Sequence, residues 1–93
     1  MPYPHIYITL TPEEREKISK ELKRLLLAGK YNKRKPLQAL WLSDQKKTFR
    51  NIANYLEKSF DTIRRWINRY RKDGLDGFIQ WLNRPGFGKG KRP

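Results

Sequence analysis

Apolar positions between Thr48 and Lys72 form two helical stripes separated by a short polar break. Both stripes have the i, i+3, i+4, i+7 spacing of one face of an α-helix. Their members are Phe49, Ile52, Ala53 and Leu56, and then Ile63, Trp66, Ile67 and Tyr70. Only residues 57–62 separate the stripes, and the turn is expected at 57–60, so the two helices must turn sharply and pack against each other. Since Thr48 and Ser59 stand where N-cap residues belong, the pattern predicts a helix-turn-helix.

A further helix is predicted near the start of the chain. Thr11 as N-cap, Pro12 at the first helical position and Glu14 three residues after the cap form a capping box. Gly29 is expected to end this helix. The apolar stripe in between consists of Ile18, Leu22, Leu25 and Leu26.

Between these two regions we expect a polar loop and one more helix. The loop covers residues 30–35, and Pro36 is expected to begin the helix because proline suits a first helical turn. Residues 43–47 are expected to form the segment in which this helix ends. Its inner stripe is Leu37, Leu40 and Trp41.

The remaining segments flank this helical body. Residues 6–10 are β-branched and aromatic enough for a strand, either as an ordered arm or paired with a second copy. Gly74 can stop the last long helix, and residues 78–82 predict a brief fifth helix. We therefore expect an all-α fold, a small bundle of about four helices containing a helix-turn-helix. Its parts are an N-terminal arm (1–10), a helix-turn-helix domain (11–82) and a flexible basic Gly/Pro-rich tail or linker (83–93).

The net charge of the chain limits the class of binding partner. The chain has 22 Lys and Arg against 9 Asp and Glu, a net charge of +13 on 93 residues, and only a polyanion is an obvious partner for that excess. Apolar runs fall far short of the ~18 residues of a spanning helix, so we expect no membrane partner. The start of the chain lacks a secretory signal pattern, which predicts a cytoplasmic protein.

The outer face of the second helix of the motif suits a DNA groove bordered by phosphates. Base-reading candidates are Phe60, Asp61, Arg64 and Arg65. Arginine reads guanine in bidentate fashion, a carboxylate accepts from cytosine and an aromatic ring meets the thymine methyl. The competing interpretations are solvated arginines, an Asp61 that serves the helix dipole and a Phe60 that covers the turn. Phosphate-binding candidates are Arg50, Ser59, Thr62, Asn68, Arg69, Arg71 and Lys72.

Residues 52–78, with residues 84–93 behind them, resemble the N-terminal DNA-binding part of bacterial insertion-sequence transposases of the IS630 type, relatives of the Tc1/mariner group. In that family an Ile-Ala pair, a Leu-Gly-x-Ser turn, Thr-Val/Ile, Arg-Trp, Arg-Tyr-Arg, Gly-Leu-x-Gly and an Arg-Pro-rich segment follow in order. The resemblance implies recognition of transposon terminal inverted repeats. The matching residues are Ile52 and Ala53, 56–59, Thr62 and Ile63, Arg65 and Trp66, 69–71, 74–77, and Arg84 and Pro85.

Three departures from the family pattern matter. Glu57 occupies the turn position that is commonly glycine, where a positive φ costs a glutamate on the order of 1 kcal/mol. Either the chain accepts that strain or the turn has a different shape. Lys58 replaces an apolar turn residue, and residues 80–82 are extra before the Arg-Pro segment. The family's catalytic domain, with three metal-binding carboxylates, lies after this region and outside these 93 residues.

The basic tail resembles segments that lie in the minor groove of A·T-rich DNA in Tc1/mariner relatives. A flexible basic chain can follow that narrow, strongly negative groove. The alternative is a disordered linker. The candidates for this contact are Arg84, Lys89, Lys91 and Arg92.

Nothing in the sequence predicts chemistry by the chain itself. The nine carboxylates are scattered, His5 is the only histidine, and there is no cysteine. We therefore expect no enzyme activity, no metal and no cofactor.

Double-stranded DNA is the expected partner, with a catalytic transposase domain in cis or in trans. Two alternatives stay open. One is a transcriptional repressor or antitoxin-like regulator that forms a homodimer through residues 6–10 or the first helix. The other is a basic RNA- or protein-binding adaptor with an exposed aromatic patch of Phe78, Trp81 and Phe87.

Overall fold

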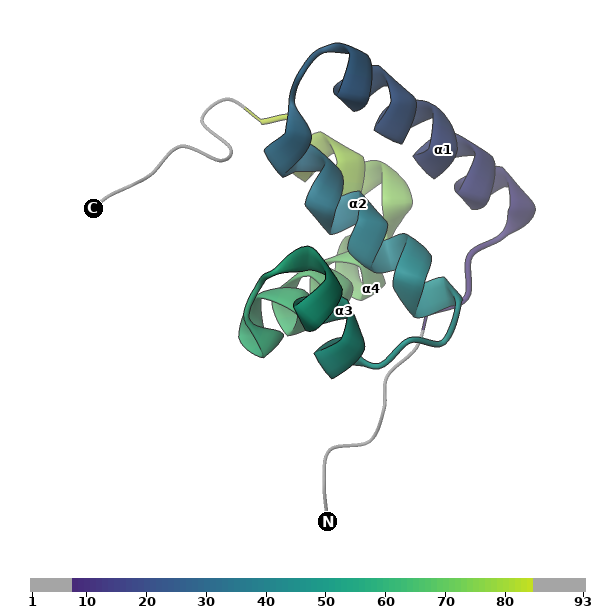
Figure 1. The fold of residues 1–93 in the computed structure, drawn as a ribbon. Helices are drawn as coiled ribbons and strands as arrows, with labels where there is room; N and C mark the ends of the chain where they lie inside the picture. Colours follow the sequence, from purple (N-terminus) through teal and green to yellow (C-terminus); the bar gives the residue numbers. More distant parts are fainter. Residues whose placement is uncertain (1–7, 85–93) are drawn as a thin grey trace.

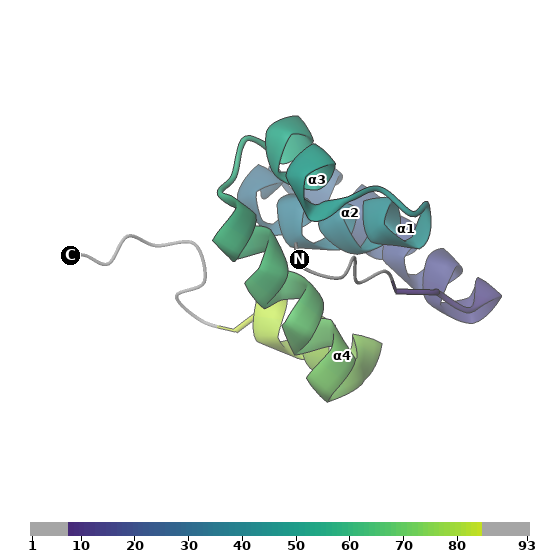
Figure 2. The same cartoon turned by 90° about the horizontal axis from the view of Figure 1, so that it is seen from below.

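The computed structural model describes residues 8–84 as four helices and no strand. They are α1 (Pro12–Leu27), α2 (Tyr31–Asp44), α3 (Phe49–Leu56) and α4 (Phe60–Leu82). Helix α2 contacts each of the other three; α1 runs antiparallel beside it, and α4 stands on one side of the other helices (Figures 1 and 2). The predicted small all-α bundle is confirmed.

One apolar core joins all four helices. The stripes of α3 and α4 supply Phe49, Ile52, Ile63 and Ile67, each at most 8% exposed. Trp41, Trp66 and Tyr70 are half-buried at the edge of this core, which fits their predicted packing role. In α1 the predicted stripe is only partly right. Ile18 and Leu25 are buried, but Leu26 is 45% exposed.

The predicted helix starts are confirmed by their hydrogen bonds. The Thr11 N–H donates to Glu14 Oε1 (3.0 Å) and the Glu14 N–H to Thr11 Oγ1 (3.1 Å), which completes the capping box. The hydroxyls of Thr48 and Ser59 each accept the N–H three residues ahead, at 3.1 Å. Each cap is worth about 1 kcal/mol to its helix.

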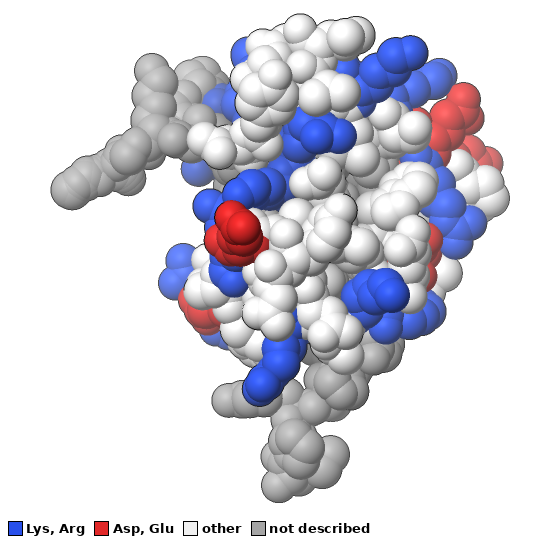
Figure 3. Space-filling model, in the orientation of Figure 1, with Lys and Arg blue, Asp and Glu red and all other residues white. Residues whose placement is uncertain are grey.

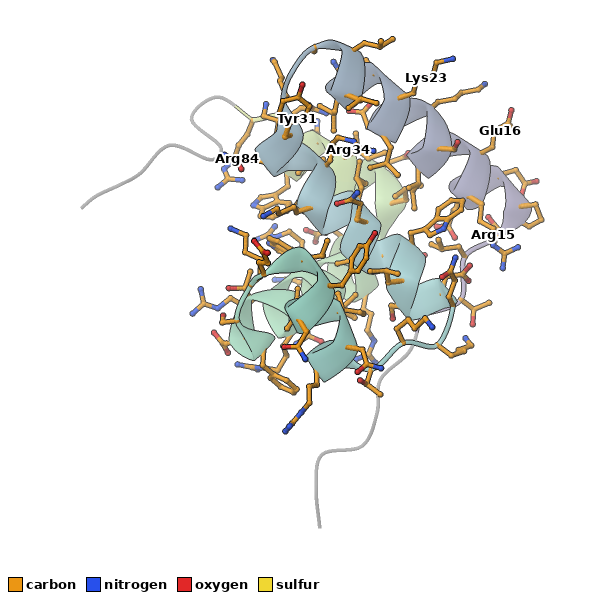
Figure 4. All side chains as sticks on the ribbon, viewed as in Figure 1. Arg15, Glu16, Lys23, Tyr31, Arg34 and Arg84 are labelled. Carbon is orange, nitrogen blue, oxygen red and sulfur yellow. The ribbon has the colours of Figure 1, made fainter. Side chains whose placement is uncertain are left out.

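The expected polar loop before α2 is wrong, since the helix already begins at Tyr31 and holds Pro36 in its interior. An interior proline removes one backbone hydrogen bond. Two features of the structure compensate for the lost hydrogen bond. Pro36 is fully buried, and Arg34, which lies between α1 and α2 in Figure 4, donates from Nε to the Leu22 carbonyl at 3.2 Å. Tertiary packing thus overrides the local proline signal.

The arm is not a strand over residues 8–10 but an extended segment on the end of α2. The Ile8 N–H donates to the Ser43 hydroxyl (3.1 Å) and the Leu10 N–H to Asp44 Oδ1 (2.9 Å). Ile8 and Leu10 are at most 5% exposed, so their side chains belong to this chain's own core. The rest of the predicted strand, residues 6 and 7, lies outside the described residues.

Helix α4 bends sharply at Gly74, whose φ of 75° and ψ of 177° are not helical. Gly74 therefore ends the first helical segment, as predicted. Residues 75–82 form a second segment held by buried Leu75, Phe78 and Leu82; the sequence predicted a brief fifth helix over residues 78–82 only. The two segments meet at an angle in Figure 1, and this angle shapes the surface beside α4.

Candidate DNA interface

The corner between α3 and α4 is built on a left-handed residue. Glu57 has φ 59° and ψ 46°, so the backbone keeps the shape expected for glycine at this position. The Lys58 N–H donates to the Ala53 carbonyl at 2.9 Å and satisfies the end of α3. The strain of a left-handed glutamate is accepted in this turn.

Phe60, the first residue of α4, packs into the corner and is partly exposed. Its ring packs edge-on against Phe49, with centroids 5.6 Å apart. It is nevertheless 41% exposed. The predicted roles of turn cover and thymine contact are thus compatible for this side chain.

Helical geometry ranks the candidate base-reading residues. Each residue turns the direction of the side chain by about 100°, so the core positions Ile63 and Ile67 fix the opposite, outward direction. Asp61, Arg65, Asn68 and Lys72 lie around that outward direction. Arg64 and Arg71 lie on one flank, nearer to the turn residue Phe60, and all of these cations are exposed.

In this structure Asp61 binds both candidate arginines. Its carboxylate pairs with Arg64 through Oδ1 and with Arg65 Nε through Oδ2 at 2.9 Å. The hydrogen bond from Arg64, helped by the charges of Arg65 and Arg64, holds the pKa of Asp61 below its ordinary value. The i, i+3 and i, i+4 spacings of these three residues would have predicted the pairing from sequence. To reach base edges, each arginine must exchange Asp61 for its new partner.

Arg69 is also engaged. Its Nη1 lies 3.1 Å from Asp73 Oδ2, and its guanidinium stacks over the Trp81 ring, 4.9 Å from the centroid. The guanidinium of Arg84 lies 5.1 Å from the same ring. Sequence alone did not predict this cluster, because the bend at Gly74 brings Trp81 beside Arg69.

The other candidate phosphate contacts lie at helix starts or along α4. Ser59 and Thr62 share a hydrogen bond between their hydroxyls (2.8 Å) while Ser59 caps α4. Arg50 is exposed in the first turn of α3, and Asn68, Arg71 and Lys72 are exposed on α4. Lys89, Lys91 and Arg92 lie outside the described residues, as do His5 and Phe87.

The aromatic patch expected for an adaptor is not formed in the described part of the chain. Phe78 is fully buried because it fills the core under the bend. Trp81 is half-buried and carries two stacked arginines. This surface is therefore cationic rather than aromatic.

Polar contacts with α1 fix the position of α4. The sequence analysis did not predict these contacts. The Tyr70 hydroxyl donates to Glu14 Oε2 at 2.9 Å. Burial, and then this hydrogen bond, raises the pKa of Tyr70 to about 12. Lys17 Nζ pairs with Asp76 at 2.7 Å, and Asn83 bonds to Glu21. Glu14 and Tyr70 are 56 positions apart, so no local spacing signals their contact.

The face that carries α1, α2 and α3 differs from the α4 surface. Uncharged side chains cover its centre and Lys and Arg lie around them in Figure 3. A groove of about 400 Å³ there is lined partly by Leu22, Leu26, Trp41 and Tyr55. This groove lies apart from the outer face of α4, where Arg65, Asn68 and Lys72 are exposed.

Residues 8–84 contain no cluster of three side chains suited to hold a metal ion. In the same range no helix is long and apolar enough to cross a bilayer.

Comparison with known proteins identifies the family. The family model described as "winged helix-turn helix" matches residues 37–92, more than half of the chain. Those residues include α3, the turn and α4, with no β-strand up to residue 84. No curated protein and no solved structure matches the chain significantly. With the corner at Glu57 and the cationic outer face of α4, the match shows that this chain belongs to the winged helix-turn-helix family and carries a helix-turn-helix DNA-binding domain.

Proposed function

We propose that the chain recognises a defined sequence in double-stranded DNA by placing residues 60–73 of α4 in the major groove. The observation that carries this proposal is the outer face of α4, where Arg65, Asn68 and Lys72 are exposed around the outward direction. An α-helix fits the major groove, where arginine and asparagine discriminate bases. The N-terminal turns of such a helix contact base edges.

Arg65 is the leading base-reading residue in this proposal. It lies near the outward direction, whereas Arg64 lies on the flank and is better placed for a phosphate. Asp61 holds both arginines in the free chain. The negative charge of Asp61 also repels DNA phosphates. A DNA site must therefore contain a base that binds Arg65 better than Asp61 does before the complex forms.

The DNA we propose as target is the terminal inverted repeat of a mobile element. The support is the resemblance of residues 52–78 to the DNA-binding part of IS630-type transposases, including the Gly-Leu-x-Gly motif at 74–77. In this proposal the chain binds DNA without catalysing a reaction, and a catalytic domain acts in cis or in trans. Binding to bacterial DNA would place the protein at the nucleoid.

The dimeric repressor has less support. Ile8 and Leu10, from the arm proposed as one dimer contact, are buried in the chain's own core. Of the two proposed surfaces, that leaves the exposed side of α1. A stable dimer in sedimentation experiments without DNA would favour the repressor.

Binding-site selection from random duplex DNA tests the proposal. The native chain, Arg65→Ala, Arg64→Ala and Lys23→Ala would be compared at about physiological salt. Lys23 is the matched control, because it projects from α1 in Figure 4 and its loss removes the same charge.

We expect the native chain and Lys23→Ala to enrich one motif, and Arg65→Ala to relax one base position, at a cost of about 1–3 kcal/mol. Arg64→Ala should weaken binding without changing the motif. If about six phosphates are contacted, log affinity should fall against log salt with a slope near −5. Equal affinity for all duplexes, or a salt slope near zero, would contradict the proposal.

A further inference from the structure

A groove runs beside α4 because the helix bends. It has a volume of about 500 Å³, and both segments of α4 contribute to its walls. The bend at Gly74 brings Trp81 from the second segment to the cationic side chains of the first. The lining residues are Thr62, Arg65, Trp66, Asn68, Arg69, Lys72 and Trp81.

The lining combines positive charge with flat apolar surface. Arg65, Arg69 and Lys72 are cationic, and no carboxylate is among the lining residues. Asp61 and Asp73 stand outside it and pair with two of these cations. Both pairs are exposed ion pairs, which contribute at most about 1 kcal/mol. An arriving phosphate can therefore replace either carboxylate.

The two tryptophans determine which chemical group, besides a phosphate, the groove can bind. An indole offers an apolar face and one N–H donor, with no acceptor. Trp66 and Trp81 are half-buried, so their exposed parts form a fixed wall. A deoxyribose ring between two phosphates has the same alternation of apolar surface and anionic oxygen as this groove requires.

Trp81 also orders two guanidinium groups. Arg69 and Arg84 lie within about 5 Å of its ring centroid, at 4.9 and 5.1 Å. A stacked guanidinium keeps its N–H donors in its own plane, where they can bind phosphate. Each guanidinium has five such donors; Arg69 donates to Asp73 and Arg84 donates to the Trp81 carbonyl.

We propose that this groove binds the sugar–phosphate backbone of one strand of the duplex that α4 enters, and that Trp81 positions Arg69 and Arg84 as phosphate ligands. This rests on the proposed function. Arg84 then contacts the backbone at the groove rather than a neighbouring minor groove. The second segment of α4 becomes part of the DNA interface.

Salt-dependent affinity tests the groove directly. A fluorescent duplex carrying the selected motif, and a single strand of the same sequence, would be titrated at about 50 and about 200 mM NaCl. The variants are Arg84→Ala, Lys72→Ala, Trp81→Leu and the double variant Trp81→Leu/Arg84→Ala, with Lys23→Ala as control. Thermal melting followed by circular dichroism verifies the fold, and the exposed Arg84 carries the test if Trp81→Leu unfolds.

We expect Arg84→Ala and Lys72→Ala each to reduce the salt slope by about 0.9, so that the affinity lost between the two salt concentrations is about 3.5-fold smaller. Trp81→Leu should reduce the salt slope by more than either of these variants, because it removes the ring that positions both Arg69 and Arg84. In the Trp81→Leu background the Arg84→Ala change should add little. Lys23→Ala should keep the native slope.

If Trp81→Leu and Arg84→Ala keep the salt slope of the native chain while Arg65→Ala still loses motif selection, the proposal that the groove binds the DNA backbone is overturned. The proposed function is then left intact. A preference for the single strand that Trp81→Leu removes would also overturn it, because the indole would then stack on a base. No motif selection by the native chain would contradict the proposed function itself.

Discussion

Replacing Glu57 with glycine should stabilise the protein. Glu57 has φ 59° at the corner between α3 and α4, a conformation in which a residue with a Cβ is strained. Glycine adopts it without that strain. The backbone bond from Lys58 to Ala53 does not involve the Glu57 side chain, so the corner should keep its shape.

Two terms set the size of the backbone effect, which is the stability of Glu57→Gly relative to Glu57→Gln. A left-handed residue other than glycine costs roughly 1–2 kcal/mol, and the greater flexibility of glycine in the unfolded chain offsets about 0.5–1 kcal/mol of the gain. A net stabilisation of about 0.5–1 kcal/mol remains. In a chain of 93 residues this raises Tm by about 2–8 °C.

The assay must separate backbone strain from charge. Glu57 stands at the C-terminal end of α3, where a negative charge is unfavourable by about 0.3–1 kcal/mol. Glu57→Gln removes the charge and keeps the strain, so the difference between Glu57→Gly and Glu57→Gln isolates the backbone term. Thermal and urea unfolding of both variants and the native chain measure it.

A second left-handed residue gives a contrast. Lys46 has φ 67°, but its Nζ donates to the Ile8 carbonyl (3.2 Å) and to the Thr9 hydroxyl (3.1 Å). Lys46→Gly should therefore gain less than Glu57→Gly. If Glu57→Gly is no more stable than Glu57→Gln, the idea that this corner stores backbone strain is refuted.

Two other substitutions test the contacts that hold the arm and α4 in place. Asp44→Asn should lose at most about 1 kcal/mol at pH 7, because the amide keeps one acceptor oxygen but loses the oxygen that accepts from Arg15 Nε and the negative charge that attracts Arg15; the hydrogen bond from Arg15 lowers the pKa of Asp44. This contribution is present above the ordinary pKa of the carboxyl and disappears as pH falls through the lowered value, so the Tm curves of Asp44→Asn and the native chain should converge below about pH 4; parallel curves would contradict it. Tyr70→Phe should cost about 1 kcal/mol and remove the phenol with a pKa of about 12 from an ultraviolet titration. Since that pKa is raised, its contribution is present below about pH 10 and lost as pH rises through 12; five phenols titrating near pH 10 in the native chain would exclude the contact.

Local signals predicted the helix-turn-helix well. The stripes that start at Phe49 and Ile63 became the packed faces of α3 and α4, and the caps at Thr11, Thr48 and Ser59 form as expected. Each of these signals acts between residues three or four apart, within a single helical turn. Such short-range geometry can be read directly from the order of residues.

The sequence by itself determined where three of the four helices begin and the cationic outer face of α4. It left the shape of the corner at Glu57 open, and the structure shows that this corner is left-handed. The tertiary structure decided the start of α2, since burial of Pro36 outweighs its helix-breaking tendency. It also decided the place of the arm, where hydrogen bonds to Ser43 and Asp44 replace a strand. The groove beside α4 belongs to the same group, because Arg69 and Trp81 meet only after the chain bends at Gly74. Contacts between residues far apart in sequence depend on how helices pack, and neither a spacing nor a single residue type encodes them.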